Sequence, residues 1–269
     1  MKRIIPVVLI SNGRVVLSRN FSRHSVQGNP KQILDRLLAW DSDEVILLDI
    51  SRNNDLHSFH SEINYCEDFN AKSDLLSLTS MSSKLTMTPL SVGGKITNLT
   101  QIEKLLSSGA DKVVINSCFF TDLKFCKRAI KEFGGSTIVA SVDYKLHEGK
   151  FKVFIKNGLV STNMELIEYC RKISELGISE ILVNSIDRDG LGSGFDMVTI
   201  NEIVTKLDTP IIACGGAGSF THFSDIFQVE GLSGAAAANI FHFKENSMYH
   251  LKKNLWESGY PVRKARLRL

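Results

Sequence analysis

The chain has 269 residues, of which 43% are hydrophobic, and a formal net charge of +3 at pH 7. Much of the positive excess lies in a basic tail at 261–269, which lacks aromatic interleaving and any nucleic-acid motif, so nucleic-acid binding is not expected. No signal peptide or membrane-length apolar run is found, and five cysteines without a Cys-x-x-Cys pair indicate a reducing compartment. We expect a cytoplasmic protein that does not bind membranes.

Short apolar runs bounded by glycine or proline predict strands, and the longer amphipathic stretches between them predict helices. The first half is expected to hold strands at 3–10, 44–50, 90–92 and 112–116, with helices at 31–40, 99–107 and 122–133. A turn at Asn12-Gly13 leads into a further short strand at 14–18, and a polar loop then runs through 28–30. The segment 51–88 is too long for its place, and its serine-rich part at 73–83 predicts a lengthened helix plus a surface loop.

The second half repeats this order. Strands are expected at 136–143, 180–185, 210–214 and from 234 towards 239–243, with helices at 163–176 and 245–258. The alternation of Phe151, Val153 and Ile155 predicts a hairpin over 144–159.

The two halves align with each other at nearly constant offsets. Gly93-Gly94 precedes Gly215-Gly216 by 122 positions, the strand at 44 precedes that at 180 by 136, and Leu9 aligns with Asp143 at 134. The fall from 136 to 122 gives the first half about 14 extra residues between Ser51 and Thr88. Eight βα units in one chain predict a single (β/α)8 TIM barrel over 1–269, with half-barrels at about 1–133 and 134–258.

Glycine pairs end the third and seventh strands. Glycine lets backbone N–H groups approach an anion closely, although glycine turns of purely structural origin are also common. With the next strand ends, the pairs predict two phosphate sites on opposite sides of one mouth, formed by Gly93, Gly94, Asn116 and Ser117 and by Gly215, Gly216, Ala238 and Asn239. A ligand with a phosphate at each end would span the barrel.

Asp143 is expected between these sites, at the top of the fifth barrel strand. A carboxylate in a walled mouth can act as a general acid or base. The alternative is a carboxylate that only bonds to loop amides.

The chain resembles the cyclase subunit of imidazole glycerol phosphate synthase over nearly its whole length. The resemblance is carried by segments in family order: 2–6, 13–16, 48–50, 92–94, 110–112, 115–117, 187–190, 217–218 and 241–243. It implies a duplicated half-barrel that binds a bisphosphate-type substrate and takes ammonia from a glutaminase subunit below the barrel. It also implies a lyase and cyclisation step in histidine biosynthesis, and adds Asp189 and Gly190 to the phosphate- and substrate-binding residues.

Four departures from the family pattern fall at the mouth. The family uses two aspartates, and Asp143 matches the second, but the first is Leu9 here. A family lysine in the first loop is Leu17, the third glycine of the first turn is Lys95, and a threonine is Leu191. Leucine can neither transfer a proton nor bind phosphate, so the catalytic competence of this chain is in question.

The opposite end of the barrel keeps the family pattern. The residues Arg3, Glu44, Lys112 and Glu180 begin strands and match the charged gate through which the family admits ammonia, and Asp111 matches a glutaminase contact. The alternative is an ion-paired plug of the barrel base without a transport role.

Three functions are therefore open. The first is ammonia supply, with a glutaminase and an ATP-dependent sugar-amidating protein, for converting an acetamido sugar into an acetamidino sugar of a surface polysaccharide. The second is the histidine-pathway cyclase, and the third is a catalytically silent barrel that activates a partner. No cofactor or metal is expected, since His57 and His60 lack further ligands at suitable spacing.

Overall fold

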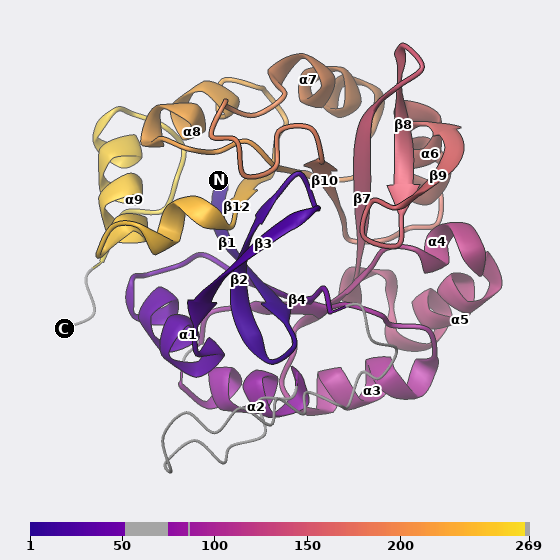
Figure 1. Ribbon diagram of the computed structural model, residues 1–269, viewed down its shortest axis with the longest axis horizontal. Helices are drawn as coiled ribbons and strands as arrows, with labels where there is room; N and C mark the ends of the chain where they lie inside the picture. Colours follow the sequence, from indigo (N-terminus) through magenta and orange to yellow (C-terminus); the bar gives the residue numbers. More distant parts are fainter. Residues whose placement is uncertain (52–74, 86, 267–269) are drawn as a thin grey trace.

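The computed structural model describes residues 1–51, 75–85 and 87–266. Parallel strands close into a barrel, because β7 pairs with β10 and β12 pairs with β1. The eight barrel strands of the described residues are β1 Arg3–Ser11, β4 Val45–Asp49, β5 Leu90–Gly93, β6 Lys112–Ile115, β7 Ile138–His147, β10 Glu180–Ser185, β11 Ile211–Cys214 and β12 Gly234–Ala237. The (β/α)8 prediction is confirmed, with four of these strands from each half of the chain (Figure 1).

Helices surround the barrel (Figure 1). They are α1 Pro30–Ala39, α2 Leu75–Leu85, α3 Leu99–Ser107, α4 Cys118–Thr121, α5 Leu123–Phe133, α6 Leu166–Ser174, α7 Met197–Lys206, α8 Phe220–Ile226 and α9 Ser247–Glu257, with 3-10 turns at Gly135–Thr137 and Asn239–His242. Polar caps fix several of their starts: the side chains of Asn29, Asn98 and Asp122 each accept a backbone N–H in the first turn. None of the described helices has both the length and the apolar character that a membrane span requires.

Antiparallel hairpins extend two of the barrel strands. β2 Arg14–Arg19 and β3 Arg23–Gly28 follow β1, while β8 Lys150–Ile155 and β9 Val160–Glu165 follow β7. The polar loop expected to run through 28–30 is thus wrong, because residues 23–28 form β3, which pairs along β2, and α1 begins at Pro30. The helix expected at 163–176 begins only at Leu166, since 163–165 belong to β9. Residues 239–242 form a 3-10 helix, and Phe243 follows it, so the strand expected to run to 243 ends at Ala237.

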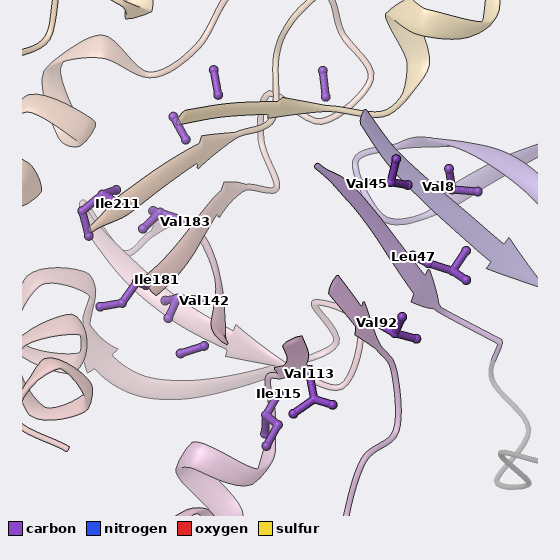
Figure 2. Close-up of a cluster of buried hydrophobic side chains, with 14 of the residues drawn as sticks. Val8, Val45, Leu47, Val92, Val113, Ile115, Val142, Ile181, Val183 and Ile211 are labelled. Carbon is purple, nitrogen blue, oxygen red and sulfur yellow. The ribbon is translucent and has the colours of Figure 1, made fainter. Parts of the chain in front are cut away.

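The hydrophobic core has two parts, because successive strand residues face opposite sides. Residues on the outer face of the strands, such as Val8, Leu47 and Val183, belong to the large core shared with the helices (Figure 2). A smaller cluster fills the barrel and contains Ile5, Val7, Ile46, Val114, Val139, Leu182, Ile212 and Ala236.

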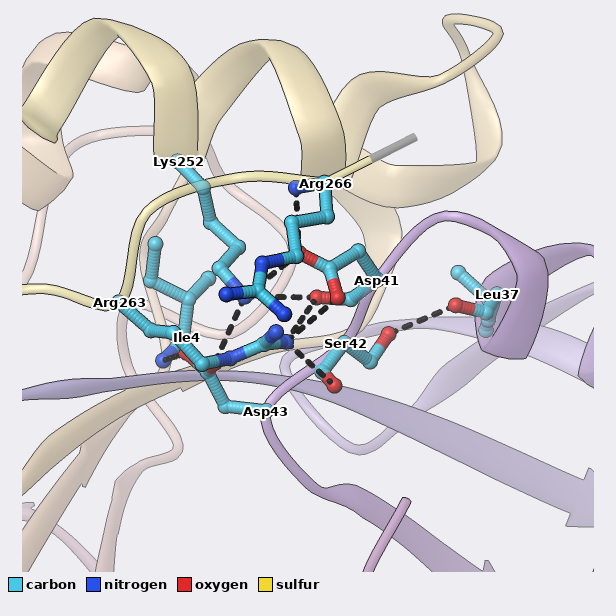
Figure 3. Close-up of polar contacts among 8 residues, drawn as sticks. All are labelled: Ile4, Leu37, Asp41, Ser42, Asp43, Lys252, Arg263 and Arg266. Carbon is cyan, nitrogen blue, oxygen red and sulfur yellow. Dashed lines mark hydrogen bonds and ion pairs between the residues drawn. The ribbon is translucent and has the colours of Figure 1, made fainter. Parts of the chain in front are cut away.

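A buried charge cluster ties the C-terminal segment to the residues before β4 (Figure 3). Lys252 is fully buried, and its Nζ lies 2.7 Å from Asp43 Oδ1 and 3.3 Å from Asp41 Oδ2. Arg263 bonds to the same two carboxylates at 2.7 and 2.9 Å. The part of the basic tail that the structure describes is therefore partly anchored by ion pairs.

Some expectations lie outside the described residues. These are the two histidines His57 and His60 and most of the segment between Ser51 and Thr88. The helix expected within 73–83 corresponds to α2, which packs beside α1 and α3.

Candidate functional site

A cavity of 510 Å³ lies at the carboxyl ends of the barrel strands. Every barrel strand or the loop directly after it contributes to its wall, and the β2–β3 hairpin adds Ser18, Phe21 and His24. In the view of Figure 1 this hairpin crosses the centre of the ring. Most of the residues predicted for the mouth line this cavity: Leu9, Gly94, Asn116, Ser117, Asp143, Asp189, Gly190, Gly215, Gly216, Ala238 and Asn239.

Asp143 is one of three buried carboxylates that line the cavity, with Asp49 and Asp189, and 6% of the residue is exposed. Its Oδ2 accepts a hydrogen bond of 2.8 Å from the side-chain amide of Asn116. Burial raises the pKa of Asp143 to about 7, an effect that Asp189 reinforces and that the amides of Asn116 and Asn184 oppose. A carboxyl group with this pKa can both give and take a proton near neutral pH.

The position that pairs with Asp143 in the internal repeat is apolar. Leu9 is half-buried, lines the cavity and contacts the apolar cluster inside the barrel together with Leu48. Leu17 lies on the hairpin opposite Ser25 and is not among the cavity-lining residues. Within the described residues, neither position therefore brings a polar group to the cavity.

In the first glycine turn, Gly93 serves strand packing and Gly94 lines the cavity. Gly93 lies in β5, where a Cβ would stand 2.4 Å from the carbonyl oxygen of Val114, so it permits close strand pairing and does not reach the cavity. Gly94 has φ +114°, and a Cβ there would meet the backbone of Asp49 at 2.3 Å. Lys95 follows at φ +55°, with its Nζ 3.5 Å from Asp49 Oδ2.

The second glycine turn is closely packed as well. Gly215 and Gly216 have φ values of +92° and +102°, and a Cβ on Gly216 would stand 2.1 Å from the carbonyl oxygen of Gly194. The next strand end brings Asn239, whose amide donates to the carbonyl oxygen of Ser18 at 2.8 Å. Its side chain therefore supports the hairpin as well as lining the cavity.

Asp189 and Gly190 also hold the hairpin. Asp189 Oδ2 accepts hydrogen bonds from Ser18 Oγ at 2.6 Å and from the backbone N–H of Phe21 at 3.2 Å. Burial raises the pKa of this carboxyl, and the two hydrogen bonds oppose the shift. A Cβ on Gly190 would lie 2.0 Å from the Ser18 carbonyl oxygen, so glycine is needed for this contact.

Several cavity-lining residues were not predicted, among them Asn184, Cys214 and Lys156. The first two follow the period-2 alternation of β10 and β11, so counting inward positions up each strand would have found them. Lys156 follows β8 at φ +54°, where the sequence gives no such signal.

The base of the barrel gathers the four charged residues predicted there. Arg3 lies 2.6 Å from Glu44 and 2.9 Å from Glu180, and Lys112 lies 2.9 Å from the same Glu180 oxygen. Ser91 adds a hydrogen bond of 2.6 Å to Glu44. Arg3, Glu44, Lys112 and Glu180 thus form one connected set of opposite charges at the base, called the ring below. The pKa of Arg3 is raised because its two glutamates outweigh its burial.

Asp111 lies just before β6 at this end. One of its oxygens accepts the backbone N–H of Leu90 at 2.8 Å, and the residue is exposed. Between the base and the mouth stands the apolar cluster inside the barrel. No group of three metal-binding side chains occurs among the residues with described positions.

Comparisons with known proteins agree with this architecture. The profile of a family described as "Histidine biosynthesis protein" matches residues 3–247. The chain is 34% identical over 264 residues to "Imidazole glycerol phosphate synthase subunit HisF" of Clostridium botulinum (strain Okra / Type B1), covering 97% of this chain and 98% of the relative. Proteins with the same name from Helicobacter hepaticus and Bacillus cereus are 35% and 32% identical over 263 residues, with the same coverage.

Proposed function

The chain belongs to the histidine biosynthesis protein family, as a relative of the HisF subunits, and on that premise we propose that it is the synthase subunit of a glutamine-dependent complex. A glutaminase would dock at the barrel base, and its ammonia would travel through the barrel to a phosphorylated acceptor at the mouth. The observation that carries the proposal is the pairing of an ion-paired ring at one end with a cavity at the other.

The ring suits an entrance for a small neutral molecule. Its charges neutralise one another at the starts of β1, β4, β6 and β10, and the interior above it is lined by aliphatic side chains. An uncharged ammonia molecule loses little on entering such an interior, whereas an ammonium ion would lose its hydration. Lys112 makes one salt bridge to Glu180 and retains partial exposure, so it is the ring member that can move with least loss.

Two acceptors are candidates. The printed names of the relatives favour the substrate of imidazole glycerol phosphate synthesis in histidine biosynthesis, and nothing in the comparisons points to a sugar. Leu9 and Leu17 favour the second acceptor, an acetamido sugar activated by an ATP-dependent partner. Leu9 stands where the family pattern has its first catalytic aspartate, and Leu17 where it has the lysine of the first loop.

Complex formation and nitrogen source test the proposal. The chain and a glutaminase-type protein from the same genome should form a 1:1 complex, which Asp111→Arg at the base weakens and Glu148→Arg at the β7–β8 hairpin tip leaves unchanged. With either acceptor, Lys112→Met should reduce glutamine-driven product formation several-fold more than ammonium-driven formation. Equal losses with both nitrogen sources would refute passage through the ring.

A further inference from the structure

Two pairs of neighbouring strands carry side chains of opposite character at the mouth. Leu9 of β1 is the register partner of Leu48 of β4, and Asp143 of β7 is the register partner of Asn184 of β10. The internal repeat relates the two pairs, because Leu9 aligns with Asp143 at an offset of 134 and Leu48 with Asn184 at 136. The two halves of the barrel therefore place an apolar pair and a polar pair at equivalent positions.

The two pairs lie on opposite sides of the cavity. All four residues line it. In the closed ring of strands, β5 and β6 separate the pairs on one side, and β11 and β12 separate them on the other. A ligand at the floor of the cavity therefore meets an apolar wall on one side and hydrogen-bonding groups on the other.

The apolar wall is accessible to a ligand. Leu9 and Leu48 pack against the cluster inside the barrel, but both are only half-buried and both line the cavity. A charged or strongly polar group placed against them would lose its hydration without gaining a hydrogen bond. A small alkyl group would instead gain from removal of its surface from water. This side of the cavity therefore favours an alkyl group.

The polar wall suits a carbonyl oxygen. Asp143 Oδ2 accepts from the side-chain amide of Asn116 at 2.8 Å, and the amide of Asn184 also interacts with this carboxyl. Because the pKa of Asp143 is raised to about 7, a substantial fraction of the carboxyl is protonated at neutral pH. A protonated carboxyl has an O–H group that can donate a hydrogen bond to a carbonyl oxygen.

The floor between the two walls continues into the interior of the barrel. Val7, Val114 and Leu182 line the cavity and also belong to the cluster inside the barrel. A carbon atom held between the walls therefore lies at the end of the proposed ammonia path. An amide with a small alkyl group fits all three features, with its alkyl group on the leucines, its oxygen towards Asp143 and its carbonyl carbon above the floor.

We infer that Leu9 and Leu48 form an apolar subsite for the alkyl group of an N-acylated acceptor whose amide oxygen faces Asp143. The inference rests on the proposed function and names the acceptor class, a phosphorylated compound that carries an N-acetyl group. Leu9 is the specificity-determining residue, because it puts an alkyl contact where the family pattern has an acid.

Calorimetric titration of the full chain tests the inference without any partner. The probes are the N-acetylhexosamine 1-phosphates of gluco, galacto and manno configuration, and the three hexose 1-phosphates that carry a hydroxyl in place of the acetamido group. At least one N-acetylated probe should bind about tenfold or more tightly than its hexose counterpart, since one apolar group in a fitted pocket is worth about that much.

Substitutions at the subsite show whether the leucines cause this preference. Leu9→Asn has a similar size and should reduce the preference to about twofold or less, with hexose 1-phosphate binding little changed. Leu9→Met keeps an apolar surface and should keep the preference. The control is Leu123→Asn at a partly exposed position of α5 outside the cavity lining, which should change nothing. Thermal unfolding checks that each variant folds, and Leu48→Asn repeats the test from the neighbouring strand.

Three results would overturn the inference. They are equal affinity for the N-acetylated and hexose probes, absence of binding of every probe at millimolar concentration, and a preference that persists in the folded asparagine variants. Glutaminase complex formation is measured separately. A chain that prefers the N-acetylated probes but forms no such complex would keep this inference and lose the proposed function.

Discussion

The two ends of the barrel treat buried charge in different ways. At the base, Arg3 and Lys112 neutralise Glu44 and Glu180 through salt bridges of 2.6–2.9 Å. At the mouth, Asp143 is equally buried but has side-chain amides rather than a cation as its hydrogen-bonding neighbours, and its pKa rises to about 7. The buried charges of the base are therefore paired in salt bridges, while the carboxyl group of Asp143 at the mouth changes protonation state near neutral pH.

The difference separates two roles. At the base, each charged side chain lies within salt-bridge distance of one of opposite sign. A buried carboxyl without a cation is poised for proton transfer, and Leu9 leaves it without the second acid that the family pattern places across the barrel. Among the carboxylates that line the cavity, Asp143 is the one that we propose for proton transfer.

The largest expected effect on stability comes from removing the salt bridges of Arg3 at the base. Arg3→Met removes the cation shared by two buried glutamates, and breaking a buried pair in this way costs about 3–5 kcal/mol of the free energy of unfolding. Urea denaturation measures the loss. The matched control is Lys150→Met in the exposed Lys150–Glu165 pair, which should unfold like the parent chain. Similar losses in both variants would mean that the ring is no more tightly coupled than a surface ion pair.

A substitution at the mouth should stabilise the protein, whereas Arg3→Met at the base destabilises it. Because the pKa of Asp143 is raised in the folded chain, its contribution to stability is full below about pH 4 and is lost as the pH rises through about 7. Asp143→Asn should therefore stabilise the protein at pH 8.5, by as much as roughly 4 kcal/mol for a shift of about three pH units, and should give no gain at pH 4. Thermal or urea unfolding across this range measures the trend.

The exposed Asp208→Asn serves as the control for this pH series. A gain for Asp143→Asn that is the same at both pH values would contradict a raised pKa. Destabilisation at pH 8.5 would mean that an interaction with the charged carboxylate outweighs its burial.

A smaller effect concerns how the hairpin is held over the mouth. Gly190→Ala places a Cβ 2.0 Å from the Ser18 carbonyl oxygen and strains a residue at φ +67°, so a loss of about 1–3 kcal/mol is expected. Gly149→Ala has a similar φ of +76° and open space, so it isolates the cost of the backbone conformation. Limited proteolysis within β2–β3 should rise in Gly190→Ala alone. Equal behaviour of both variants would argue that the close approach to Ser18 has no energetic weight.

The sequence predicted the barrel because its signals are repeated. The apolar period of β10 and the capped helix α3 appear at the predicted bounds, and the offset between halves identified Leu9 as the counterpart of Asp143. The charged residues of the base were found because each stands at or next to the first position of a strand, and parallel strands start at the same end of a barrel.

Other parts of the mouth carried no such signal. β3 is polar and largely exposed, so no burial pattern marks it and it forms by pairing with β2. Asp189 and Asn239 were expected at a phosphate site, but their hydrogen bonds to the hairpin depend on contacts across 171 and 221 positions that a linear reading does not contain. The cation at Lys95 was visible, but its distance to Asp49 was not.

Formation of imidazole glycerol phosphate from the bisphosphate substrate and an ammonium salt tests most directly whether Asp143 works alone. General acid–base groups typically contribute about 10²–10⁴-fold to a rate, so the unmodified chain should give no product above background. Leu9→Asp with Leu17→Lys should fold, because Leu9 faces the cavity and Leu17 is only half-buried on the hairpin, and should recover a trace of product. Robust cyclisation by the unmodified chain would contradict the account and assign the chain to the histidine-pathway reaction.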